Sequence, residues 1–308
     1  MLNRILAAFL ALGLLPLVTA AQSSASSVPP APKTQVVILG TGTPVANPDT
    51  SGPAVAIVVN GAAYLVDCGP GVVRRAAAAE RNGIAALKVS NIKVVFITHL
   101  HSDHTLGYPD LIFSPWVLGR KEPLEAYGPR GLQDMTEHIE KAWEKDIDVR
   151  TNGLEHGNRT GYQVHVHEIA PGIVYKDANV TVKSFLVAHG SWDQAFGYRF
   201  ETTDRTIVLS GDTAPTDAIV KACNGCDVLL HEVYNEVDPS RGPDWLKYLR
   251  AFHTSTFELA KLATEAKPGL LVLYHQGYGH SASESVLLAE IKQHYSGKVV
   301  SAHDLDVY

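Results

Sequence analysis

The sequence has 308 residues, of which 45% are hydrophobic and 19% are charged, so it is long enough to bury one large core or two small ones. Lys and Arg number 26 against 32 Asp and Glu, and the net charge of −6 argues against a chain built to neutralise many phosphates. The 25 Gly and 17 Pro are close to average usage, which excludes collagen-like repeats and general disorder.

Residues 1–21 predict a secretory signal peptide. Arg4 supplies a positive start, an uncharged apolar run covers residues 5–18, and small residues follow before the expected cleavage point. Because the run is short for a span of roughly 20 residues, we expect cleavage rather than a membrane anchor. Residues 22–33 are rich in Ser, Ala and Pro and predict a flexible leader, which leaves 34–308 as one domain. The protein is then expected to be periplasmic or secreted, with no membrane association.

Strand and helix patterns alternate along the domain, which predicts a layered α/β fold. The predicted strands are 35–39, 54–59, 63–66, 94–97, 180–187, 196–201, 206–209, 228–230, 270–274 and 299–300. The predicted helices are 71–80, 130–145, one that begins with a capping box at Ser255, and 283–294. Asn60-Gly61 indicates a hairpin turn, and the irregular stretch 143–178 predicts a surface excursion.

The three cysteines fit an oxidising compartment. Cys223-Asn-Gly-Cys226 can close a tight disulfide, and the chain has no second CxxC to complete a zinc site with it. We therefore expect a structural disulfide rather than a redox motif. Cys68 is then a single thiol, expected to be buried after a strand.

The segment His99-Leu-His-Ser-Asp-His104 follows a predicted strand directly and is the strongest motif in the chain. Side chains two residues apart on an extended segment point the same way, so His99 and His101 can hold one metal ion. Asp103 and His104 come as the chain turns, and their different direction suits a second ion.

Two ions need more ligands than this motif provides. His189, Asp212 and His275 each follow the end of another predicted strand, where loops of α/β folds converge. We predict that they complete the site and that Asp212 bridges the two ions. Two Zn²⁺ ions are expected, although Mn²⁺ or Fe accept the same nitrogen and oxygen ligands. The other paired histidines, His165 and His167, predict a half-exposed strand face. We expect the remaining candidates to lie at the surface: His138, His156, His294 and His303.

The motif His99–His104, followed along the chain by His189, Asp212 and His275, resembles the ligand set of the metallo-β-lactamase superfamily. The resemblance extends from about residue 34 to the end of the sequence. Additional motifs resemble the branch that contains ribonuclease Z, zinc arylsulfatases and cyclic-nucleotide phosphodiesterases: Gly40-Thr-Gly-Thr-Pro44, Leu65-Val-Asp-Cys-Gly-Pro-Gly71, Tyr127-Gly-Pro-Arg-Gly131, Phe196-Gly-Tyr198, His231-Glu232 and His253-Thr-Ser-Thr256. The resemblance implies an αββα sandwich with a di-metal site at one sheet edge. It implies site one as His99, His101 and His189, and site two as Asp103, His104 and His275, with Asp67 supporting the ligand loop.

The expected chemistry is attack by a hydroxide that bridges the two metals. Asp103 is placed to orient that hydroxide and accept its proton. A poor leaving alkoxide needs a proton, and the resemblance implies His253 as the donor with Glu232 orienting its imidazole. A helix N-cap is the alternative role for His253. Tyr278 and His280, just past the last ligand, are weaker candidates for substrate contacts.

Two departures from ribonuclease Z bear on the substrate. Gln276-Gly-Tyr-Gly stands where that enzyme has an Arg-containing stretch. Its substrate arm is basic, whereas residues 143–178 here carry Lys145, Arg150, Arg159 and Lys176 against six acidic residues. We therefore expect an exported di-zinc hydrolase that cleaves a phosphate or sulfate ester of a small organic molecule, with nucleic acid not expected as a partner. The alternatives are a ribonuclease Z-like endonuclease, a lactonase or β-lactamase, and a metal-binding protein without turnover. Dimers are common in this branch, so a homodimer is also considered.

Overall fold

The computed structural model describes residues 34–238, 240–277 and 283–308. The predicted signal peptide, 1–21, and leader, 22–33, lie outside the described residues, as do Tyr278 and His280. Within the described ranges, no helix is both long and apolar enough to cross a bilayer.

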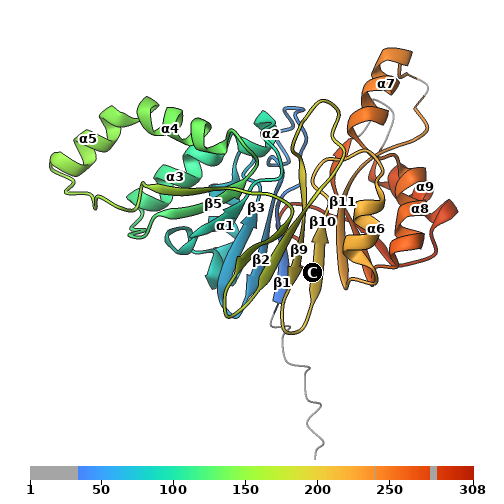
Figure 1. The fold of residues 1–308 in the computed structure, drawn as a ribbon, viewed down its shortest axis with the longest axis horizontal. Coiled ribbons are helices and arrows are strands. Elements are labelled where there is room, and N and C mark those ends of the chain that lie inside the picture. The colour runs from blue at the N-terminus through green and yellow to red at the C-terminus, as the bar shows by residue number, and fades with distance from the viewer. Residues whose placement is uncertain (1–33, 239, 278–282) are drawn as a thin grey trace, which may run out of the picture. The chain divides into compact units, whose positions relative to one another are not determined.

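Two β-sheets form the centre of the fold (Figure 1). The first contains, in spatial order, β1 (Thr34–Gly40), β2 (Ala54–Val59), β3 (Ala62–Val66), β4 (Val94–Phe96), β5 (Leu124–Gly128) and β6 (Val164–Glu168). The second contains, in spatial order, β13 (Val299–Ser301), β12 (Leu270–Gly277), β11 (Val228–Tyr234), β10 (Thr206–Leu209), β9 (Phe196–Glu201), β8 (Thr181–Leu186) and β7 (Gly172–Lys176).

The strand β2 shows how the layers follow from the sequence. All six of its residues are buried, which requires that both faces of the sheet be covered. Alternate side chains point to opposite faces, so Val55 and Ile57 pack with Phe196 and Phe200 of the second sheet. Ala56, on the other face, packs beneath the helices.

Helices cover the outer face of each sheet (Figure 1). Those on the first sheet are α1 (Val72–Arg81), α3 (Tyr108–Val117) and α4 (Leu132–Ala142), and those on the second are α6 (Asp217–Cys223), α8 (Thr256–Ala266) and α9 (Glu284–His294). The remaining helices are α2 (Ser102–Thr105), α5 (Glu144–Asn152), α7 (Pro243–Phe252) and the short 3₁₀ turns Ala85–Leu87 and Val89–Asn91. The arrangement is an αββα sandwich, which confirms the predicted fold.

Several local predictions are also confirmed. Asn60 and Gly61 have φ of 49° and 81°, as a two-residue hairpin turn between β2 and β3 requires. Ser255 and Glu258 form the capping box of α8. A disulfide joins Cys223 to Cys226 in the turn between α6 and β11. Cys68 is free and buried, and every histidine predicted at the surface is exposed.

Other predictions are wrong. The helix predicted for 130–145 is two helices, because the chain turns at Trp143 between α4 and α5. The predicted surface excursion 143–178 contains β6, which pairs with β5, and β7, which pairs with β8. Both are edge strands with a solvent-exposed face. The strand β6 confirms that His165 and His167 lie on a half-exposed strand face, whereas β7 was not predicted.

Candidate metal centre

The predicted ligands come from the ends of strands in both sheets. His99 to His104 follow β4 and enter α2, His189 follows β8, and Asp212 follows β10. His275 differs from the prediction, because β12 continues to Gly277 and does not end before it. It has a φ of 45° where the pairing of β12 with β11 shifts register. Such a bulge turns a side chain out of the alternating pattern, here toward the other ligands.

The structure brings all seven predicted ligands together. The donor atoms of His99, His101, His189 and Asp212 lie within 4.8 Å of one another, and those of Asp103, His104 and His275 form a second such group. His101 Nδ1 lies 2.9 Å from His99 Nε2 and 3.1 Å from His189 Nε2. Asp212 Oδ2 lies 3.4 Å from His104 Nε2 and 3.5 Å from His275 Nε2, so it adjoins both groups. This grouping matches the two predicted sites, while metal binding itself stays a prediction.

Two buried atoms of the cluster indicate that a cation fits there. His104 Nε2 and Asp212 Oδ1 have no hydrogen-bond partner among the described residues, although both side chains are buried. A buried polar atom without a partner is costly, and metal coordination would satisfy both. Nitrogen and oxygen donors of this kind suit zinc and the neighbouring divalent metals.

The protonation states of three predicted ligands suit a metal, whereas burial of His104 is outweighed by Asp212 and Asp67, which raise the pKa of its imidazole well above the ordinary value. Burial lowers the pKa of His99 well below its ordinary value and lowers that of His189 to about 4, so both imidazoles are neutral at pH 7. Burial opposes ionisation of Asp212, but His275 and His104 outweigh it and hold the pKa of this carboxyl well below its usual range. Neutral imidazole and ionised carboxylate are the forms that bind metal ions.

A second set of contacts fixes the ligands in place. The Asp67 carboxylate accepts hydrogen bonds from the Thr98 amide and from His104 Nδ1, both over 2.8 Å. His189 Nδ1 donates to the Phe252 carbonyl over 2.7 Å, which leaves Nε2 directed at His101. Such contacts orient a metal-binding imidazole. The Asp67 position agrees with the supporting role that the resemblance implied.

His253 and Glu232 lie beside the ligands. His253 Nδ1 is 3.4 Å from Glu232 Oε2 and 3.9 Å from Asp212 Oδ2. Burial disfavours the charged imidazole, but the Glu232 carboxylate outweighs it and raises the pKa of His253 to about 9. The N-cap of α8 is Ser255, so the alternative role of His253 as a helix N-cap is wrong; His253 is instead the C-cap residue of α7.

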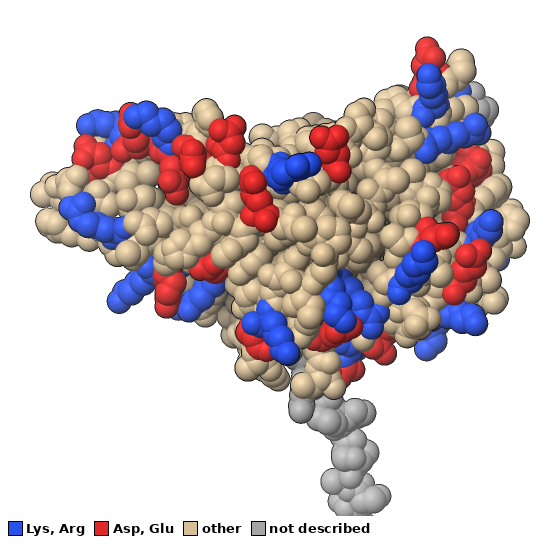
Figure 2. Space-filling view, viewed as in Figure 1, with Lys and Arg blue, Asp and Glu red and all other residues tan. Residues whose placement is uncertain are grey.

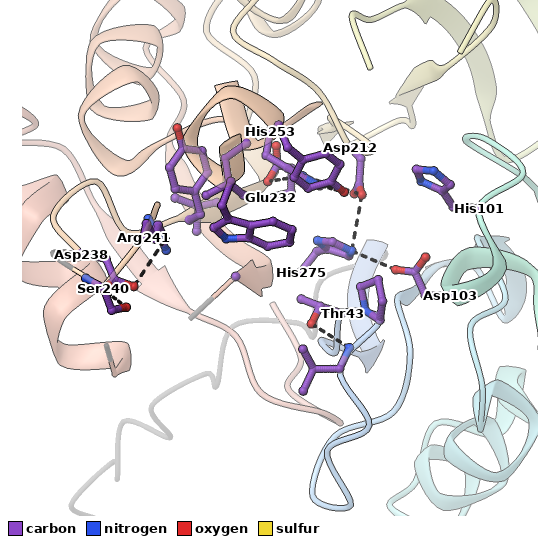
Figure 3. Close-up of a pocket in the computed structure, with 18 of the residues that line it drawn as sticks. Thr43, His101, Asp103, Asp212, Glu232, Asp238, Ser240, Arg241, His253 and His275 are labelled. Carbon is purple, nitrogen blue, oxygen red and sulfur yellow. Dashed lines mark hydrogen bonds and ion pairs between the residues drawn. The ribbon is translucent and has the colours of Figure 1, made fainter. Parts of the chain in front are cut away.

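A cavity of about 580 Å³ opens onto these groups (Figure 3). His101 and Asp103 lie at one end of the view, and Asp238, Ser240 and Arg241 lie at the other. The wall of the cavity also includes Pro44, Val45, Trp245, Tyr248, Leu249 and His253.

The sequence analysis did not identify the aromatic residues of this wall. Trp245 and Tyr248 belong to α7, a helix that was not predicted, although Pro243 at its first turn is a helix-start signal. Trp192 is a further contact that was missed, and its indole N–H donates to His101 Nε2 over 2.9 Å. The spacing Trp245, Tyr248, Phe252 was the available signal, because residues three and seven apart share one helix face.

Comparison with known proteins supports the assignment of this site to a family. Residues 63–276 match the beta-lactamase superfamily domain family. A ribonuclease Z of Mycobacterium bovis is 32% identical over 280 residues, which cover 88% of this chain and 96% of the relative. A ribonuclease Z of a Mycobacterium species is 34% identical over 245 residues, covering 78% of this chain and 83% of the relative.

Solved structures give the same result. The short form of human tRNase Z has a TM-score of 0.65 and 26% identity, covering 89% of this chain and 98% of that one. A metallo-β-lactamase fold protein of Bacillus subtilis, YhfI, has a TM-score of 0.68 at 19% identity, covering 89% of this chain and 99% of that one, and it shows the fold alone. The chain therefore belongs to the metallo-β-lactamase superfamily, in its ribonuclease Z branch.

Proposed function

We propose that the protein is a metal-dependent phosphodiesterase that cleaves RNA. The single observation that carries this proposal is the His253–Glu232 pair, because a proton donor beside the metal ligands serves a poor leaving group such as a ribose alkoxide. The curated relatives described above are named ribonuclease Z, and the human structure is named tRNase Z.

This proposal corrects the expectation drawn from the sequence. We expected a small organic phosphate or sulfate ester and did not expect nucleic acid as a partner. The named relatives favour the ribonuclease Z alternative instead, and those reported above give no support for a sulfate ester. The earlier expectation rested on the Gln276-Gly-Tyr-Gly stretch and on the acidic residues of 143–178, together with the net charge of −6. None of these features excludes phosphate binding at a local metal site.

The charges on the surface bear on how such an enzyme would hold its substrate. Figure 2 shows Lys and Arg interspersed with Asp and Glu, with no large basic patch on the face displayed. Within 143–178, Arg150 pairs with Asp146 and Glu155, and Lys145 pairs with Asp148. Because these cations already have acidic partners, we propose that recognition depends on the metal site and cavity more than on a basic arm.

The residues that would hold the metals are the seven described above, and we propose Zn²⁺ as the ion. When bound, divalent ions at such a site activate water at neutral pH and stabilise the negative charge that develops on phosphate. Asp103 Oδ2 lies 3.2 Å from His275 Nε2, and we propose that the Asp103 carboxylate would accept a proton from the attacking water.

We propose that His253 donates a proton to the leaving oxygen. Its Nδ1 faces the Glu232 carboxylate, which holds the ring in place and stabilises its charged form. Its Nε2 lies 3.5 Å from the Tyr248 hydroxyl in the cavity wall, and we propose that the proton passes from Nε2 to the leaving oxygen. Glu232 is itself fixed by the Thr254 amide, which donates to it over 2.8 Å.

The test compares substrates with zinc-loaded full chain: a short RNA, p-nitrophenyl sulfate and a chromogenic lactam. We expect RNA cleavage, and we expect His253→Ala to lower kcat on RNA by at least about 100-fold. The control is His294→Ala, which changes an exposed histidine on α9 and should leave kcat unchanged. Intact RNA alongside turnover of the sulfate or the lactam would overturn the proposal.

We also propose that the chain is exported, on the basis of its first 21 residues and of the disulfide at Cys223 and Cys226. To test export, the full chain is expressed in a bacterium, and the protein recovered from the periplasm and from the culture medium is sequenced from its N-terminus. We expect a chain that begins at residue 21 or 22. An unprocessed chain confined to the cytoplasm would contradict export without affecting the proposed chemistry.

A further inference from the structure

Three aromatic side chains form a stack along one face of α7. The Trp245 and Tyr248 rings have centroids 4.9 Å apart at 22°, and the Tyr248 and Phe252 rings have centroids 4.7 Å apart at 25°. Their spacing of three and four residues places them on one side of the helix. We call these three residues the aromatic ladder.

The aromatic ladder runs from solvent to the metal ligands. Trp245 is 54% exposed at one end, although a large apolar side chain gains nothing from contact with water. At the other end, the Phe252 ring lies against the rings of His189, at 5.1 Å, and His101, at 6.5 Å. Trp245 and Tyr248 both line the cavity. The exposed end of the ladder is therefore continuous with the candidate metal centre.

The charged group near this end of the cavity has partners of its own. The Arg241 guanidinium donates to the Asn235 side chain over 2.5 Å, pairs with Asp238 at 3.4 Å, and lies 5.1 Å above the Tyr234 ring. Figure 3 shows the pair of Arg241 and Asp238. Because the charge of Arg241 is already balanced by Asp238, we expect a ligand at this end of the cavity to contact the aromatic ring of Trp245 rather than the guanidinium.

From this arrangement we infer that Trp245, at the exposed end of the aromatic ladder, is a stacking site for the nucleobase of the nucleoside that carries the leaving oxygen. The Tyr248 ring, packed between Trp245 and Phe252, supports it from behind. We assign the site to the leaving nucleoside because of Tyr248. Its hydroxyl lies 3.5 Å from His253 Nε2, the atom that we propose protonates the leaving oxygen. An aromatic ring stacks on any base, so the site accepts the base without reading its sequence. This assignment rests on the proposed function.

The first test uses paired RNA oligonucleotides that differ only in whether the leaving nucleoside carries its base or is abasic. Trp245→Ala is expected to lower kcat/KM about tenfold on the intact RNA and to leave the abasic RNA unaffected, in line with the loss of one stacking ring. Trp245→Phe should retain most of the preference. The control is Trp143→Ala, because Trp143 is also exposed and stacked, on Phe113, but does not line the cavity. Equal losses on both RNAs would overturn the inference.

The second test is independent of turnover. Binding of adenosine and of ribose to the full chain is measured by calorimetry, with and without zinc. We expect adenosine to bind at least tenfold more tightly than ribose, and Trp245→Ala to abolish this difference. No preference for adenosine in the unaltered chain would overturn the stacking site.

The two tests separate the inference from the proposed function. If RNA is not cleaved but adenosine binding depends on Trp245, the stacking site is supported and its assignment to a leaving nucleoside is overturned. If RNA is cleaved without any effect of Trp245, the proposed function stands and the inference fails. Sedimentation of the unaltered chain and of Trp245→Ala provides a further check. If the substitution dissociates an oligomer, the stacking site is overturned, because the exposed ring of Trp245 would then pack against a second copy of the chain.

Discussion

Asp67 accepts a hydrogen bond from His104 Nδ1 over 2.8 Å, which directs the opposite ring nitrogen of His104 toward Asp212. Asp67 is 1% exposed and has a φ of 60°, a backbone conformation that few residues other than Gly, Asn and Asp adopt readily. The turn after β3 thus combines an unusual backbone with a carboxylate that orients a candidate ligand.

The first prediction concerns this carboxylate. Asp67→Asn keeps a residue that tolerates the positive φ but removes the charge that orients His104. We expect zinc affinity to fall by about 10- to 100-fold, as is usual when such a supporting contact is lost. Competition with a chromogenic chelator measures it, and Asp134→Asn, whose side chain is 79% exposed, is the control. Unchanged affinity would show that Asp67 has no part in metal binding.

Gly69 supports the second prediction, because the backbone packs closely around it. A Cβ at this position would lie 2.6 Å from the Asp103 carbonyl oxygen and 2.4 Å from the Gly52 carbonyl carbon. We expect Gly69→Ala to displace the ligand loop, to lower the free energy of unfolding by about 1–3 kcal/mol and to weaken zinc binding. Urea unfolding and zinc titration measure the two effects.

Gly83→Ala provides the matched control. A Cβ at Gly83 would meet open space, while its φ of 101° still makes the substitution strained. It should cost about 1 kcal/mol of stability without altering zinc affinity. If Gly69→Ala leaves zinc affinity equally unaffected, close packing at Gly69 does not position Asp103.

The disulfide supports a third prediction. It links Cys223 and Cys226, which are both buried, across the short turn that leads into β11. Removing it by a double Cys→Ser change should lower the free energy of unfolding by about 2 kcal/mol, a value typical of a short loop. Thermal unfolding with and without a reductant checks this, since the reductant should destabilise the unaltered chain and not the variant. Equal midpoints for the two chains would contradict the prediction.

A fourth prediction concerns acid stability, at a site far from the ligands. The Asp177 carboxylate accepts hydrogen bonds from the Tyr64 and Tyr175 hydroxyls, at 2.5 and 3.0 Å, and from the Asn179 and Val180 amides. Burial disfavours its ionisation, but these donors outweigh it and lower its pKa below the ordinary 3.8. The ionised carboxylate therefore adds stability above that pH, and the contribution is lost as pH falls through the lower folded-state value.

Asp177→Asn is accordingly expected to be less stable than the unaltered chain at pH 7, by up to about 1 kcal/mol, because the site is exposed and screened. The difference should shrink steadily below about pH 4, where the carboxylate of the unaltered chain becomes protonated. Urea unfolding across pH 2.5 to 7 measures it. A difference that grows toward acid would show that the sign of the pKa shift is wrong.

The sequence was sufficient to predict the candidate site but not all of its surroundings. The spacing from His99 to His104 and the strand ends before His189 and Asp212 indicate a shared edge, because parallel strands of a layered fold bring their ends together. The position of His275 inside β12 was not predictable, since a bulge depends on how two strands pair. The ladder on α7 was also missed, because an apolar helix face normally indicates burial, whereas here one end is exposed.

The most direct test of the account is the leaving-group dependence of the His253→Ala effect in the zinc-loaded chain. RNA releases an alkoxide that needs a proton, whereas bis-p-nitrophenyl phosphate releases a phenolate that leaves without one. If His253 is the proton donor, its loss should lower kcat on RNA by at least about 100-fold and change kcat on the aryl diester by only a few fold. An equal loss on both substrates would contradict the account, because His253 would then support the site without donating a proton.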